Sequence, residues 1–138
     1  HLVPIESFTN RGMQFHELQL VTELVFRGQI EVVGRRAHKN NFKLFEEDLK
    51  ECVEKAQSAI VLNFQQDYFL NENNCEFGSP HYSPLASVDL VAGMISVADV
   101  DPDVHELYSL SIKRAFEGMQ FENPITNLPR GWFVLKRI

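Results

Sequence analysis

Two strand-like segments in the middle of the chain constrain the fold most, because almost nothing separates them. Residues 81–88 and 91–97 are both rich in apolar side chains and are joined only by Asp89 and Leu90. Parallel neighbours need a crossover connection of about a dozen residues, whereas antiparallel neighbours can be joined by two. The sequence therefore predicts a hairpin or two successive antiparallel strands here, and a doubly wound parallel fold fits less well.

Apolar residues spaced by three and four predict helices over residues 13–27, 42–57 and 104–117. Gly28 and Gly118 follow two of these segments, where helices commonly end. The run from Asp101 to Asp103 supplies candidate caps for the third helix. The first two of these helices are amphipathic, with their apolar residues on one face.

Short β-branched and aromatic runs predict further strands at residues 30–35, 59–65 and 131–138, with loops at 67–80 and 123–130. The resulting order is helix, strand, helix, strand, loop, two strands, helix, strand. This order predicts an α+β fold with a mainly antiparallel sheet and flanking helices. With 138 residues, the chain has the size of one domain, and we expect residues 1–138 to share one core.

Charge and motif content exclude several classes of function. Thirteen basic residues stand against nineteen acidic ones, for a net charge of −6, and no basic run is present, so no nucleic-acid partner is expected. No apolar stretch approaches the ~20 residues of a membrane-spanning helix. Neither a phosphate-binding glycine loop nor a metal-ligand spacing occurs, so we expect no cofactor and no metal. The sequence does not assign the protein to a cellular compartment.

His81 and Asp99 are the strongest candidates for chemistry. His81 begins a predicted strand beside a long polar loop, and Asp99 follows the end of the neighbouring strand, eighteen residues later. If these strands pair, the carboxylate meets the imidazole and orients it, as in nucleophilic triads. Spacing alone does not establish this pair, because a His and an Asp at such a distance are common.

A family resemblance appears in the same segments. Residues 78–85 have the sequence G-S-P-H-Y-S-P-L, and residues 88–100 have the sequence V-D-L-V-A-G-M-I-S-V-A-D-V. These segments resemble the second half of the phytochelatin synthase family, whose members carry G-H-F-S-P-I followed by a strand ending in L-D-V. The helices and strands upstream occur in the family's order, and residues 129–133, P-R-G-W-F, resemble the terminal strand of bacterial relatives.

The resemblance implies a papain-like cysteine-protease fold in which His81 is the general base and Asp99 orients it. The family's nucleophilic cysteine opens a helix upstream of the segment matched here, so it is expected outside this chain. Cys52 falls on the apolar stripe of a predicted helix, where a thiol is unreactive. Cys75 falls in a loop without a helix N-terminus to activate it.

We therefore expect a fragment or subunit of a phytochelatin-synthase-like catalytic domain. The chain begins with His1 rather than Met, which favours a missing upstream part. The implied activity is thiol-dependent acyl transfer or amide hydrolysis on a peptide-like or thioester substrate. The expected partner is a polypeptide segment that carries the nucleophilic cysteine, or a second copy of the chain. The alternative is a non-catalytic binding module that keeps the fold.

The substrate-binding residues are not identified by the sequence. Relatives carry an Arg and aromatic residues after L-D-V-A, whereas Asp101 and Asp103 follow Asp99 here. Two carboxylates in place of a positive charge disfavour an anionic γ-glutamyl group. Glutathione is therefore not an assured substrate.

The remaining polar and aromatic candidates have ordinary structural explanations. We expect surface positions for three histidines: His16, His38 and His105. Three acidic residues are predicted to lie in the first turn of the third helix, where the helix dipole stabilises negative charge: Asp101, Asp103 and Glu106. Trp132 and Phe133 are expected in the core or at an interface. The Ser83 hydroxyl is expected to bond locally rather than act as a nucleophile.

Overall fold

The computed structural model describes residues 13–70, 80–104 and 106–138. Four helices are present within these residues: α1 (Phe15–Val25), α2 (Phe42–Lys55), α3 (Gln66–Phe69) and α4 (Ile112–Met119). Six strands accompany them: β1 (Ile30–Arg36), β2 (Ser58–Gln65), β3 (Pro80–Asp89), β4 (Met94–Val97), β5 (Tyr108–Ser111) and β6 (Gly131–Arg137). The predicted α+β fold is confirmed.

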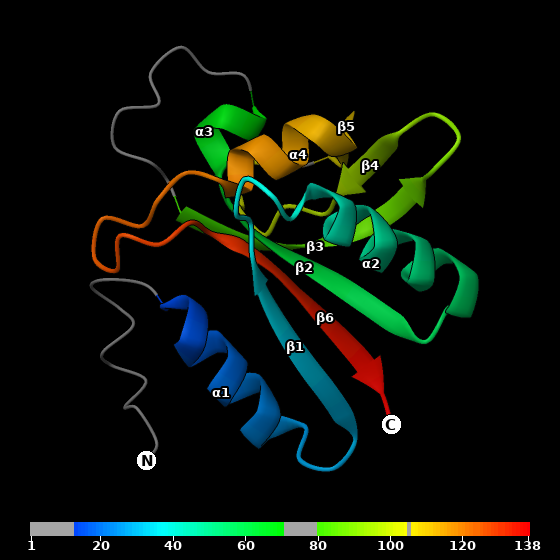
Figure 1. The fold of residues 1–138 in the computed structure, drawn as a ribbon, viewed down its shortest axis with the longest axis vertical. Helices are drawn as coiled ribbons and strands as arrows, with labels where there is room; N and C mark the ends of the chain where they lie inside the picture. Colours follow the sequence, from blue (N-terminus) through cyan, green and yellow to red (C-terminus); the bar gives the residue numbers. More distant parts are fainter. Residues whose placement is uncertain (1–12, 71–79, 105) are drawn as a thin grey trace.

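The strands form one six-stranded sheet in the order β1-β6-β2-β3-β4-β5 (Figure 1). Every neighbouring pair is antiparallel, as the short connections between the middle strands predict. The last strand, β6, lies between β1 and β2, so the C-terminal strand pairs with two strands from the first half of the chain. β6 pairs with β2 from Ser58 to Asn63, and the end of β2 beyond Asn63 pairs with β3 at His81 and Pro80.

The two faces of the sheet are covered by different helices. Trp132 and Val134 of β6 point into the main core, which includes Phe45 and Leu49 of α2 and several residues of α4. Phe133 of β6 points the other way, into a smaller cluster with residues of α1. Successive strand residues alternate between faces, so a single apolar strand fills both cores. Trp132 and Phe133 are both fully enclosed, and their predicted core positions are confirmed.

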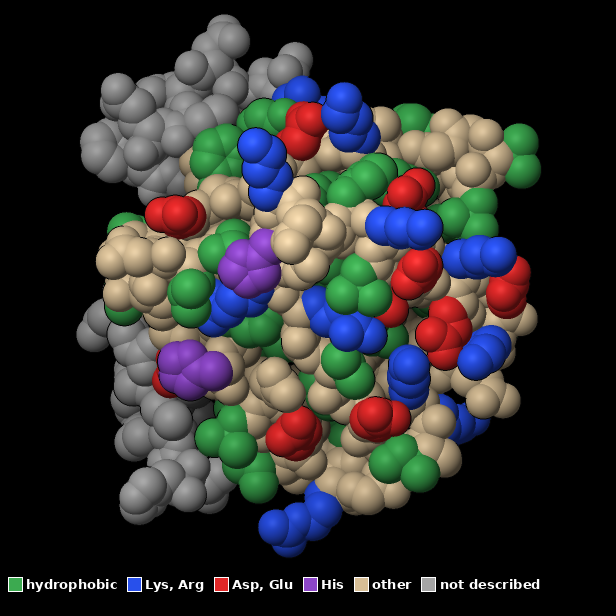
Figure 2. Space-filling model, viewed as in Figure 1, with side chains coloured by type: hydrophobic (Ala, Val, Ile, Leu, Met, Phe, Trp, Pro, Cys, Tyr) green, Lys and Arg blue, Asp and Glu red, His purple; other side chains and the backbone are tan. Residues whose placement is uncertain are grey.

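The outer surface of α2 carries both signs of charge. Red and blue side chains alternate over the region of α2 in Figure 2, without a large patch of one sign. Two pairs lie one helical turn apart, with 3.1 Å between Lys55 Nζ and Glu51 Oε1 and 3.9 Å between Lys50 Nζ and Glu54 Oε1. Such exposed pairs stabilise a helix only modestly.

The predicted helix over residues 104–117 is wrong in its first half. Residues Tyr108–Ser111 form the edge strand β5, which pairs with β4, and α4 begins only at Ile112. Ser111 is the N-cap, because its side chain accepts a hydrogen bond from Arg114 N at 3.0 Å. Asp101 to Asp103 therefore cap no helix. Pairing with β4 outweighs the helical spacing of the apolar residues in this segment.

Other boundaries also differ from the predictions, and α1 is two residues shorter at each end than the helix predicted at 13–27. The predicted loop at 67–80 begins with a single helical turn, α3. The ring of Phe69 in this turn stacks on the ring of Phe64 in the core, with the ring centroids 3.9 Å apart. The strand predicted at 91–97 starts only at Met94, because Gly93 has a positive φ of 67° in the preceding turn. Helix α2 ends at Lys55, and Ala56 then takes a left-handed conformation with a φ of 50°.

Candidate active site

His81 is held at the start of β3 by the neighbouring strand. It stands directly opposite Phe64 of β2, and the two rings lie 5.9 Å apart between centroids. Asn63 Nδ2 donates a hydrogen bond to the carbonyl oxygen of His81 at 3.1 Å. Opposed residues in an antiparallel pair share a face, so His81 lies on the face that carries the main core.

Asp99 lies two residues after the end of β4. Two hydrogen bonds tie this segment to β3: Ala98 N donates to Pro84 O at 3.0 Å, and Val100 N donates to Ser83 Oγ at 3.1 Å. Ser83 is fully buried, so its hydroxyl serves to hold the backbone beside Asp99. The prediction of a local bond for Ser83 is wrong, because its partner Val100 is 17 residues away in the sequence.

The structure brings His81 and Asp99 together. Nε2 of His81 lies 3.1 Å from Oδ1 of Asp99, while the His81 side chain is 21% exposed and the Asp99 side chain 0%. The Nε2–H bond is not aligned with that oxygen, and Nε2 has no aligned partner among the described residues. Pairs of this kind are often poorly aligned in free enzymes and tighten when substrate binds.

Neutral donors surround the Asp99 carboxylate. Tyr108 of β5 donates its hydroxyl to Oδ2 at 2.6 Å, and the backbone N–H of Asp101 donates to Oδ1 at 3.0 Å. Gln66 of α3 contributes its side-chain amide at 3.4 Å from each oxygen. The same amide donates to Oδ2 of Asp101 at 2.9 Å. A buried carboxylate needs such donors because it has lost its hydration.

The electrostatics of the site keep Tyr108 protonated and Asp101 ionised. Burial raises the pKa of the Tyr108 hydroxyl, and its hydrogen bond to Asp99 and the nearby negative charges raise that pKa further. Hydrogen bonds from the Asp103 N–H and from Gln66 lower the pKa of the Asp101 carboxyl, and the charge of His81 acts in the same direction. At neutral pH, Asp101 therefore adds a second negative charge beside the site.

Gln66 and Tyr108 were not found by the sequence reasoning. Gln66 lies between the strand predicted at 59–65 and the loop predicted at 67–80, and Tyr108 fell inside the predicted third helix. The alternation of apolar and polar residues in Y-S-L-S at 108–111 was the sequence signal for a strand, but four residues are too few to outweigh a helical pattern. Only the pairing of β4 with β5 brings Tyr108 to Asp99.

The structure keeps the other candidates apart from this pair. Cys52 is partly buried against the main core, and its thiol lies 3.3 Å from Ser58 O, so its predicted core position is confirmed. His16 and His38 are exposed, as predicted. Cys75 and His105 fall outside the described residues. Asp101, Asp103 and Glu106 lie on no helix, so their predicted interaction with a helix dipole is wrong.

No group of three or more His, Cys, Asp or Glu side chains within the described residues is arranged to hold a metal ion. Likewise, no helix in this part of the chain is long and apolar enough to cross a membrane.

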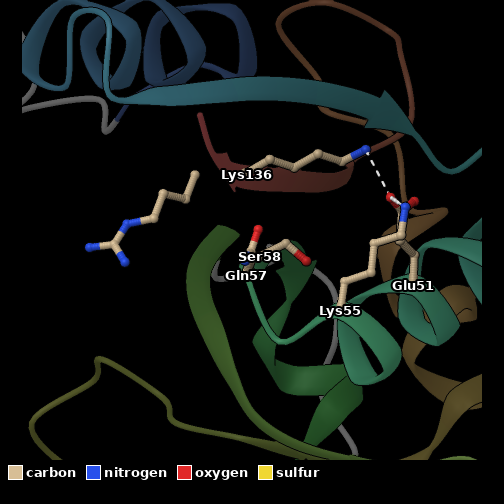
Figure 3. Close-up of a pocket in the computed structure, with 6 residues that line it drawn as sticks. Glu51, Lys55, Gln57, Ser58 and Lys136 are labelled. Carbon is tan, nitrogen blue, oxygen red and sulfur yellow. Dashed lines mark hydrogen bonds and ion pairs between the residues drawn. The ribbon is translucent and has the colours of Figure 1, made fainter.

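A cavity of about 170 Å³ lies at the opposite end of the sheet (Figure 3). Lys136 of β6 and Lys55 of α2 both approach Glu51 there, with 3.4 Å and 3.1 Å from Nζ to Oε1. Ser58 pairs with Lys136, whereas Gln65 at the other end of β2 pairs with Pro80 beside His81. The whole length of β2 thus separates this cavity from His81.

The fold and the site define an α+β domain with an antiparallel sheet and a histidine–aspartate pair at one end of its central strands. The family model of phytochelatin synthase matches residues 1–132, which is nearly the whole chain. The chain therefore belongs to the phytochelatin synthase family. A search of individual curated proteins found no match.

Proposed function

We propose that this chain is the base-bearing part of a papain-like, thiol-dependent acyltransferase or amide hydrolase. His81 serves as the general base, and Asp99 holds its imidazole in position. The observation that carries the proposal is the 3.1 Å approach of His81 Nε2 to the buried Asp99 carboxylate, in a chain of the phytochelatin synthase family. Because Nε2 of His81 faces Asp99, Nδ1 is the ring nitrogen that accepts the proton of the nucleophile.

The reaction begins with a cysteine thiol from outside this chain. The thiol gives its proton to Nδ1 of His81, and the thiolate attacks the carbonyl carbon of an amide or thioester. The bond to the leaving amine or thiol breaks, and His81 returns the proton to that leaving group. An acyl-thioester remains on the cysteine. Water, an amine or a thiol then attacks it, with His81 as base again, and the cysteine is regenerated.

The charge beside the site bears on the substrate. Asp101 lies within hydrogen-bond reach of Gln66, which also contacts Asp99, so two carboxylates share this corner. An anionic group placed next to them would be repelled. We propose a peptide-like or thioester substrate whose reacting end carries no negative charge on this side of the site.

A partner chain has a candidate surface on α1, which covers the face of the sheet opposite the one that carries His81. Four large apolar side chains at the end of this helix are more than one third exposed: Leu20, Leu24, Val25 and Phe26. Clustered exposed apolar side chains are typical of interaction surfaces. The same observation favours a second candidate function, a non-catalytic binding module that uses the surface and has lost catalysis.

The two functions are separated by an assay of the full-length protein. Thiol-dependent release of an amine or thiol from a peptide-like substrate should be abolished by prior alkylation and reduced by several orders of magnitude in His81→Ala. Cys52→Ser and Cys75→Ser are the matched controls, and both should retain activity. Partner binding without any turnover supports the binding module. Loss of activity in a folded Cys75→Ser protein would place the nucleophile within this chain.

A further inference from the structure

The two oxygens of the Asp99 carboxylate have different surroundings. Oδ1 faces His81 Nε2 at 3.1 Å and accepts the Asp101 backbone N–H, whereas Oδ2 accepts the Tyr108 hydroxyl at 2.6 Å. The Tyr108 bond is the shortest of these contacts. It belongs to the stronger class of hydrogen bonds, in which a hydroxyl donates to an ionised acceptor.

We propose that Tyr108 and Gln66 are positioning residues that fix the plane of the Asp99 carboxylate and thereby set which nitrogen of His81 carries the proton. This inference rests on the proposed function, because it assigns these residues a part in the work of His81. Neither residue touches the reacting atoms. Both act through Asp99, from elements that the sequence does not place near it.

The carboxylate is fixed because its donors come from separate elements. Tyr108 lies on β5, Gln66 on α3, and the Asp101 N–H on the segment after β4. Rotation of the carboxylate would stretch the Tyr108 bond to Oδ2, which at 2.6 Å is shorter than the 3.4 Å contact of the Gln66 amide with the same oxygen. Residues held by contacts from several rigid elements keep their geometry better than residues on one loop.

Tyr108 suits this task because it stays protonated across the pH range in which histidine titrates. Burial raises the pKa of its hydroxyl, and the charges of Asp99 and Asp101 raise it further. Among the described residues, the titratable and charged groups that face Asp99 are His81 from β3, Asp101 from the segment after β4 and Tyr108 from β5. Of these, Tyr108 acts as a constant donor.

The consequence concerns the neutral form of His81. When Oδ1 is held toward Nε2, the proton of the neutral imidazole is favoured on Nε2, and the lone pair on Nδ1 is free to accept a thiol proton. When the carboxylate rotates, this preference weakens. Fewer molecules then present the tautomer that the reaction requires, as expected for a base that has lost its orienting group.

The test is nitrogen NMR of histidine-labelled, full-length protein at a pH where the imidazole is neutral. In Tyr108→Phe, the His81 signals should move from the Nε2–H tautomer toward the average of both tautomers. Tyr82→Phe is the matched control. Tyr82 lies next to His81 but donates its hydroxyl to Met13 O at 3.0 Å, so this variant should leave the His81 signals unchanged.

Kinetics of the same variants give the second readout. Tyr108→Phe should lower kcat about tenfold, which corresponds to about 1.4 kcal/mol, with KM unchanged. Gln66→Leu tests the proposal independently if Tyr108→Phe does not fold, and it should move the His81 signals in the same direction. Unchanged His81 signals in both folded variants would overturn the proposal. A shift of those signals in a protein without turnover would support the positioning role and refute the proposed function.

Discussion

The Asp99 side chain is completely buried beside a histidine that is still one-fifth exposed. This asymmetry suits an orienting carboxylate, which must keep its charge out of water, and a base, which must reach a substrate. Burial of a carboxylate costs free energy unless donors replace its lost water. Tyr108, Gln66 and the Asp101 N–H supply those donors here.

Replacement of Asp99 by asparagine tests the orienting role at the residue scale. Asp99→Asn keeps the shape but presents an amide that can donate, so it favours the wrong tautomer of His81. The corresponding change in a serine-protease triad lowers kcat about 10⁴-fold, and we expect a large loss here, of roughly 10²-fold or more. Steady-state kinetics of the full-length protein measure it. Turnover within twofold of wild type would contradict the role.

Asp101 predicts a specific dependence of stability on pH. Because its folded pKa lies below the ordinary value of 3.8, ionised Asp101 stabilises the folded state above about pH 4. This contribution is lost as the pH falls through the lowered folded pKa. The difference in unfolding free energy between the wild type and Asp101→Asn, measured with urea, should therefore be present at pH 7 and should shrink as the pH falls below about 4. A constant difference across that range would show that the charge of Asp101 is irrelevant.

At the scale of elements, β5 and α4 show how a helical pattern was overridden. The apolar residues of 104–117 have helical spacing, yet Tyr108–Ser111 pairs with β4 and the helix starts after Ser111. An edge strand that pairs with its neighbour gains backbone hydrogen bonds, which local spacing does not reveal. The position of the Ser111 cap decides where the strand ends and the helix begins.

Removal of that cap should destabilise the protein. Ser111→Ala deletes the acceptor for Arg114 N, and the expected loss in the free energy of unfolding is about 1 kcal/mol. Ser109→Ala is the control, since Ser109 is exposed on the same strand and contacts only the Ser96 hydroxyl among the interactions described. Its effect should stay within about 0.5 kcal/mol. Denaturant unfolding of both variants gives the comparison, and equal losses would refute the cap.

At the scale of the molecule, the apolar surface of α1 predicts association. We expect residues 1–138, produced alone, to self-associate or to require a partner, because Leu24, Val25 and Phe26 are 37%, 68% and 40% exposed. Leu24→Lys should weaken that association in sedimentation experiments. Val91→Lys is the control, because Val91 is fully exposed in a turn far along the sheet. A monomeric wild type would count against a half-domain.

Elements with strong local signals were predictable from the amino-acid sequence. The short link at Asp89 and Leu90 required antiparallel strands, and the apolar stripe of α2 placed Cys52 against the core. His81 and Asp99 were also found from the sequence, through their family context and the expected pairing of their strands. The predictions of the strands and of the α2 stripe depend on patterns of residues that are close along the chain.

Only the tertiary structure decided what surrounds Asp99. Gln66 lies 33 residues before Asp99 in the chain, and Tyr108 belongs to a segment whose local pattern favours a helix. Their meeting depends on the order of strands in the sheet and on the packing of α3 against Phe64. Strand order is set by the total burial of both faces, which is a property of the whole chain. No local spacing encodes it, so these donors became visible only in the folded protein.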